Sequence, residues 1–163
     1  MLVTAVAFPD VVLAVHIAAV VISFGVIFAY PVIYLAAARL GPQAMPFYYR
    51  MRALLGQRLI SPGLALVLAA GIYLASDLHQ WHQFYVQWGL AIVVVLGGLG
   101  GGFLSPRERK LAELAEREVA AAGSGAVSWS AEYRALSKRV VMVDSLMLVL
   151  VLVTVYLMTV HAG

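Results

Sequence analysis

Two ionisable side chains stand inside long apolar stretches of the sequence, where charged groups are rarely tolerated. His16 is the only ionisable residue besides tyrosine in 11–38, and Asp144 lies near the start of 140–161. Burying an imidazole or a carboxylate in such a stretch is costly, so each is a functional candidate by default. An imidazole can ligate haem iron or relay protons, and a carboxylate can bind a proton or a cation. These two residues are therefore the first candidates for a functional site.

The stretches that hold these residues are long enough to cross a lipid bilayer. The chain has 163 residues, of which 63% are hydrophobic and 12% are charged, and its mean hydropathy is +0.94. An ordinary soluble domain has about 25% charged residues, and about 20 helical residues cross a hydrocarbon core. We therefore predict an all-α integral membrane four-helix bundle that forms a single domain. Its four predicted spans are about 11–38, 59–76, 84–104 and 140–161.

The basic residues predict how the chain is oriented. All eleven Lys and Arg residues lie in two connections, 39–58 and 105–139, which join the first span to the second and the third to the fourth. By the positive-inside rule both connections are cytoplasmic loops, so both termini and the 77–83 loop face outward. We expect a multi-pass protein of the bacterial cytoplasmic (inner) membrane whose main partner is the lipid bilayer. The clustered basic residues then set the membrane topology and contact anionic lipid, and they do not indicate nucleic-acid binding.

The two cytoplasmic connections have different sequence patterns. Residues 106–122 combine strong helix formers with an apolar face, which predicts a short amphipathic cytoplasmic helix between spans 3 and 4. From about Ser130, a helix of about 30 residues should run unbroken into the fourth span. In 39–58, the run Phe-Tyr-Tyr at 47–49 stands beside arginines, and we interpret it as an aromatic belt at the membrane interface.

His16 has two chemical interpretations. It is either a neutral imidazole hydrogen-bonded to a neighbouring helix or a water, or an axial ligand of haem b in the outer half of the bundle. For a haem, Gly71 and Gly89 would provide space at a similar depth. Phe24 would lie further down the first span, and Met158 would supply a second ligand. A haem protein of this kind would act in electron transfer, small-molecule redox chemistry or sensing. It would be a haem-dependent oxidoreductase, or it would work with a membrane redox partner or a quinone.

Asp144 also has a structural and a functional interpretation. It is either bonded to a neighbouring Arg or Ser, or it forms part of a proton path or an ion site. His16 and Asp144 are expected at different depths, so a chain of waters or polar side chains would have to link them. This leaves open a second function, in which the protein is a non-catalytic membrane subunit or a small transporter. His16 and Asp144 would then be packing or proton-path residues, and a homo-oligomer is compatible with either function.

Two further features of the sequence resemble binding motifs. His79 and His82 are three residues apart in the outer loop and could bind a transition metal if that loop is helical, although no carboxylate or thiolate supports them. Solvated loop histidines are the preferred interpretation. The glycine-rich run 97–102 lacks the strand and the Gly-Lys-Ser/Thr of a phosphate-binding loop. We interpret these glycines as places of close helix contact or bending.

The first two spans also match a family pattern. It consists of six spaced residues: His16, Phe24, Phe28, Pro31, Pro62 and Gly71. In these positions the chain resembles the membrane-bound HemJ-type protoporphyrinogen oxidases and the copper-resistance protein D-like group. The fourth span resembles an uncharacterised bacterial family of four-helix integral membrane proteins within that group. The resemblance implies a helical membrane fold and haem binding at His16, whereas the functional third-helix lysine of those enzymes has no counterpart in 84–104.

Overall fold

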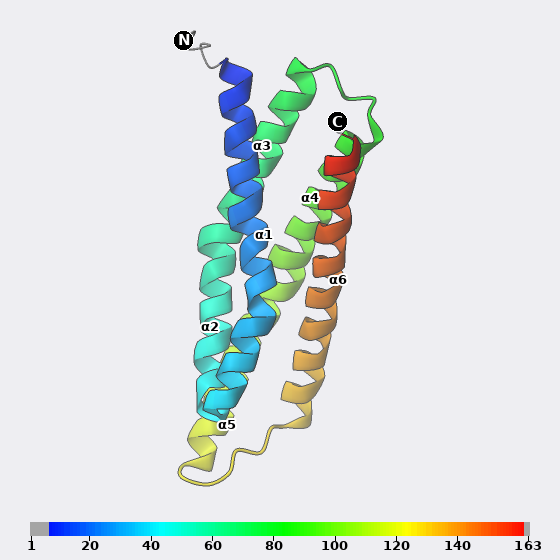
Figure 1. Ribbon diagram of the computed structural model, residues 1–163. Helices are drawn as coiled ribbons and strands as arrows, with labels where there is room; N and C mark the ends of the chain where they lie inside the picture. The colour runs from blue at the N-terminus through cyan, green and yellow to red at the C-terminus, as the bar shows by residue number, and fades with distance from the viewer. Residues whose placement is uncertain (1–6, 162–163) are drawn as a thin grey trace.

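Four long antiparallel helices make up the protein, as seen in a computed structural model that describes residues 7–161 (Figure 1). Each is long and apolar enough to cross a membrane, which confirms the predicted all-α four-helix bundle. The four helices are Phe8–Leu40, Pro42–Asp77, Phe84–Ala122 and Ala131–Val160. Because the number of crossings is even, the two ends of the described chain lie at the same end of the bundle (Figure 1).

Two of the long helices are built from several helical segments. The second consists of a 3₁₀ turn, η1 (Pro42–Ala44), followed by α2 (Met45–Leu55), the π-helical η2 (Gly56–Ile60) and α3 (Ser61–Asp77). The third consists of α4 (Phe84–Gly97), the π-helical η3 (Gly98–Leu104) and α5 (Ser105–Ala122). The first and fourth are the continuous helices α1 (Phe8–Leu40) and α6 (Ala131–His161). π-Helical turns are rare and often occur at functional sites.

The segment 39–58 differs from its predicted structure as a loop. Most of it is α2, which packs against α5, so this part of the chain extends the bundle as ordered helix. Tyr48 and Tyr49 are 3% and 2% exposed, whereas Phe47 is 69% exposed. The interfacial-belt interpretation is therefore wrong for the two tyrosines. They are buried because α2 places them against neighbouring helices, where Tyr49 contacts the Tyr133 ring edge to face at 6.2 Å.

The connection 105–139 agrees with its predicted helices. Helix α5 covers the predicted amphipathic segment and buries Leu111 and Ala115 completely. It ends at Ala122, and the following Gly123 has a φ of +54°, which favours glycine. Helix α6 then runs unbroken for 31 residues. We call the end that contains α2, α5 and the start of α6 the basic end, because all eleven Lys and Arg residues of the chain lie there.

The most extensive packing joins α1 with α3 and α2 with α5, followed by α4 with α6. Small residues allow these close approaches, and Ala19 and Ala70 are buried within the bundle. The opposite faces of the same helices expose large aliphatic side chains, among them Val21 at 65% and Leu152 at 56%. This arrangement suits a bundle that is surrounded by lipid.

Candidate functional site

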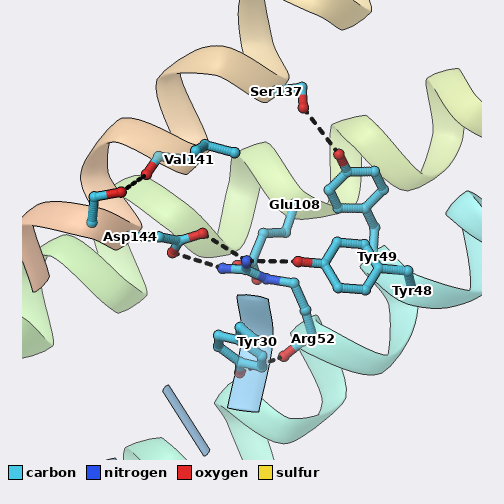
Figure 2. A network of polar contacts seen from close by, with 9 residues as sticks. Tyr30, Tyr48, Tyr49, Arg52, Glu108, Ser137, Val141 and Asp144 are labelled. Carbon is cyan, nitrogen blue, oxygen red and sulfur yellow. Dashed lines mark hydrogen bonds and ion pairs between the residues drawn. The ribbon is translucent and has the colours of Figure 1, made fainter. Parts of the chain in front are cut away.

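The most highly charged part of the interior lies at the basic end, where Arg52 of α2 sits between two carboxylates. Glu108 of α5 and Asp144 of α6 approach its guanidinium from different sides (Figure 2). Arg52 Nε and Nη2 donate to Glu108 Oε1 at 2.9 and 2.6 Å. Its Nη1 and Nη2 donate to the two oxygens of Asp144 at 2.6 and 2.8 Å. Three long helices are thereby joined by one ion cluster, which consists of Arg52, Glu108 and Asp144.

Tyrosine side chains complete the surroundings of Arg52. Its Nη1 also donates to the Tyr48 hydroxyl at 3.1 Å, and its guanidinium lies 4.2 Å from the centre of the Tyr30 ring. The Tyr30 hydroxyl donates to the Arg52 carbonyl oxygen at 3.4 Å. A guanidinium has five N–H donors, and these contacts use all five. Arg52 therefore has no donor left for a further partner.

The two carboxylates differ in how many of their oxygens accept a hydrogen bond. Both oxygens of Asp144 accept a bond from Arg52, but only Oε1 of Glu108 does so, and no hydrogen bond to Glu108 Oε2 is found among residues 7–161. The Glu108 residue is 5% exposed and Arg52 is 2% exposed. With both carboxylates ionised, one positive and two negative charges leave the cluster with one excess negative charge.

A cavity of about 210 Å³ adjoins the ion cluster. The cluster and Tyr30 line one side of it, and the π-helical segments η2 and η3 contribute to its walls. Other polar groups on its wall are Gln57, Ser61 and Ser105. The remaining wall is made of glycines and aliphatic side chains: Gly56, Gly97, Gly100, Gly101, Ile27, Ala53, Ile60, Leu64, Leu96, Leu104 and Met147.

His16, the first candidate from the sequence, lies in the opposite half of the bundle and does not contact the cluster. Its ring packs against Gly71 of α3, where a Cβ atom would be 3.3 Å from His16 Cε1. The Nδ1 atom of His16 is buried without a hydrogen bond, and the polar neighbour of the ring is the backbone of Val67 on α3. The imidazole is thus held by packing against Gly71 and by the backbone of Val67.

A second unpartnered polar atom lies on the same face of α1. Ser23 is 0% exposed, and its hydroxyl oxygen has no hydrogen-bond partner. His16, Ser23 and Tyr30 are spaced seven residues apart, which is about two helical turns and about 10 Å per step. The polar face of α1, defined by these three residues, therefore runs from the histidine down to the ion cluster.

The packing around His16 does not fit a haem. The space beside Gly71 is filled by His16 itself, and the space beside Gly89 is filled by Met158, whose Cε would be 2.1 Å from a Cβ atom there. Phe24 is 6% exposed and belongs to the hydrophobic core. No Lys or Arg lies in this half of the bundle to meet propionates. The residues expected to form a porphyrin cleft instead pack against one another.

The outer-loop histidines are exposed in the turn between α3 and α4. His79 Nδ1 lies 3.1 Å from the carbonyl oxygen of Asp77, and His82 Nε2 lies 3.3 Å from Gln83 Nε2. Within residues 7–161, no group of three or more His, Cys, Asp or Glu side chains is arranged to hold a metal ion. The turn is not helical, so it does not provide the shared helical face on which the metal interpretation depended.

Sequence reasoning found Asp144 but missed its partners. The charge pattern includes Arg52 only as one of the basic residues of 39–58, and Glu108 lies in the predicted amphipathic helix without an assigned role. A signal for their burial was present, because Arg52 follows the apolar positions Met45 and Tyr49 at helical spacing. Glu108 likewise lies three residues before Leu111, on the apolar face of α5. A charged residue in an apolar position of a helix is expected to be paired when it is buried.

Comparison with protein-family models, curated proteins and solved structures finds no match for this chain. The resemblance to the HemJ-type and copper-resistance protein D-like group therefore stays a prediction.

Proposed function

We propose that this chain is a small membrane transporter without enzymatic activity, and that His16 and Asp144 belong to a path for protons through the bundle. The observation that carries this proposal is that two carboxylates share one buried guanidinium beside a cavity. A buried charge that lacks a partner is strongly destabilised. A proton or another cation that neutralises the cluster is therefore stabilised there, and its arrival and departure are the elementary steps of transport.

The polar face of α1 supports a connection between the cluster and the other half of the bundle. Ser23 lies midway between His16 and Tyr30. Its Oγ atom is buried without a partner, and His16 Nδ1 is buried with only the Val67 backbone as a polar neighbour of its ring. Buried polar atoms of this kind are usually satisfied by protein groups or by ordered water. Steps of about 10 Å are too long for direct hydrogen bonds, so water would have to bridge them.

The distribution of charge supports a direction for the path. All Lys and Arg residues lie at the basic end, which by the positive-inside rule faces the cytoplasm. The ion cluster then lies near the cytoplasmic side and His16 near the outer side of a bacterial inner membrane. Both termini would be outside, as expected from the sequence.

Proton flux in reconstituted vesicles tests this proposal. The purified protein is placed in liposomes that contain a pH-sensitive dye, and a potassium diffusion potential with valinomycin makes the interior negative. Wild-type vesicles should acidify several-fold faster than protein-free vesicles. The Ser23→Ala variant should lose this flux, because it removes the hydroxyl midway along the path while leaving a side chain that fits the same space.

A serine elsewhere in the membrane-spanning part provides the matched control. Ser145 on α6 is exposed, and its hydroxyl donates to the carbonyl oxygen of Val141 at 2.9 Å. Ser145→Ala should conduct protons like the wild type. Wild-type vesicles that acidify no faster than protein-free ones would refute the transporter, and an unaltered flux in Ser23→Ala would refute the path along α1.

A further inference from the structure

The polar wall of the cavity offers a negatively charged acceptor but no free cationic donor. All five N–H donors of Arg52 are already bonded, so its charge is directed into the cluster. Glu108 lines the cavity and is 5% exposed, and its Oε2 atom has no hydrogen bond among residues 7–161. A ligand in the cavity can therefore reach a carboxylate whose second oxygen accepts no hydrogen bond within residues 7–161.

We propose that this cavity binds a small alkylammonium ion, whose ammonium group donates to Glu108 Oε2. This inference rests on the proposed function and names the class of solute that is carried. The ammonium charge compensates the excess negative charge of the cluster in a low-dielectric site. The alkyl group lies against the aliphatic wall, to which Leu64, Leu96 and Met147 contribute.

Other classes of ligand fit this wall less well. An anion would need donors that Arg52 no longer has, and it would add to the negative charge. Hard metal ions take about six or more oxygen ligands, and no group of three or more potential metal ligands is found in the described chain. A neutral apolar molecule would fill the space but would leave the cluster charged and Glu108 Oε2 unpartnered.

The size of the cavity limits the alkyl group. Its volume of about 210 Å³ is below the roughly 300–1,000 Å³ of pockets for drug-sized ligands. Glycines leave part of this volume open, because a Cβ atom at Gly100 or Gly101 would have no neighbouring atom within 4 Å. A chain of a few carbon atoms suits such a space, and a larger side chain placed on this wall would compete with the ligand.

Isothermal titration of the full-length protein in detergent tests the inference with three probes of similar size. n-Propylammonium chloride should give a saturable isotherm, whereas sodium propionate and 1-propanol should not. Glu108→Gln, which removes the carboxylate charge, should weaken n-propylammonium binding by at least about tenfold. Glu113→Gln alters an exposed carboxylate on the same helix and should bind like the wild type.

A second pair of variants leaves the ion cluster intact, in case Glu108→Gln does not fold. Gly100 lines the cavity, and Gly98 of the same π-helical segment does not, and both have open space where a Cβ would lie. Gly100→Leu should abolish n-propylammonium binding, and Gly98→Leu should retain it. The inference is overturned if wild-type protein shows no saturable binding, if propionate or propanol binds equally well, or if Gly100→Leu binds like the wild type.

The alkylammonium site and the proton path can be refuted independently of each other. Ser23→Ala should keep wild-type affinity for n-propylammonium, because Ser23 does not line the cavity. Absence of n-propylammonium binding together with a Ser23-dependent proton flux would refute the alkylammonium site alone. Saturable binding without any proton flux would support the site and refute the proposed proton path.

Discussion

Ser23 on α1 and Gly63 on α3 lie so close together that a Cβ atom at Gly63 would be 1.9 Å from the Ser23 hydroxyl oxygen. The same Cβ would be 3.2 Å from Ser23 Cβ, and Ser23 is 0% exposed. Glycine at position 63 therefore permits this close approach of the two helices without displacing the Ser23 side chain. The contact fixes the middle of the polar face of α1 against α3.

Gly63→Ala should lower the free energy of unfolding by about 1–3 kcal/mol, because the added methyl group forces α1 and α3 apart. Thermal unfolding in detergent measures the change. Gly25→Ala is the control, since Gly25 is exposed on α1 and a Cβ there meets no atom within 4 Å. That variant should be neutral or slightly stabilising. Equal melting of the two variants would show that the close contact is absent.

Replacing Arg52 alone should destabilise the protein far more than replacing the whole ion cluster. Arg52→Met leaves two carboxylates facing each other without a cation and should cost about 3–5 kcal/mol. The triple variant Arg52→Met/Glu108→Leu/Asp144→Leu should recover most of this stability, because apolar side chains need no partner. Unfolding curves of the single and triple variants measure both effects.

The control for this series is Arg58→Gln, which alters an exposed arginine close in sequence to Arg52. It should unfold like the wild type. A triple variant as unstable as Arg52→Met would mean that the cluster is needed for folding itself. A triple variant that is stable but conducts no protons would assign the cluster to function.

The sequence was sufficient to predict the four helices, because runs of about 20 apolar residues have few other solutions. It was insufficient for the cluster, because partners such as Arg52 and Asp144 are 92 positions apart and meet only through helix packing. Arg52 also lies in a segment that the charge pattern marks as a loop, whereas packing between α2 and α5 makes it helix. The packing around His16 could not be predicted from the sequence either, because a glycine such as Gly71 can leave room for a ligand or pack against the imidazole. In the structure it packs against the imidazole.

Because Gly71 and Gly89 are filled by His16 and Met158, we expect the purified protein to carry no haem. Protein expressed in haem-replete cells should show no Soret absorption band. The control is the same preparation of His16→Ala, which should fold and give an identical visible spectrum. A Soret band in the wild type that is lost in His16→Ala would restore the haem interpretation and would require the helices to separate around the ring.

The two ends of the bundle should be labelled from opposite sides of the membrane. The chain has no cysteine, so single cysteines can be placed at will. His82 lies in the α3–α4 turn, at the end where the described chain begins and ends, and Ser124 lies in the connection between α5 and α6 at the basic end (Figure 1). Because basic loops are retained in the cytoplasm, His82→Cys should react with an impermeant maleimide added to intact cells, and Ser124→Cys should react only after the membrane is opened. Labelling of Ser124→Cys in intact cells would reverse the topology and place the ion cluster on the outer side, and the proton path would then have to be entered from that side.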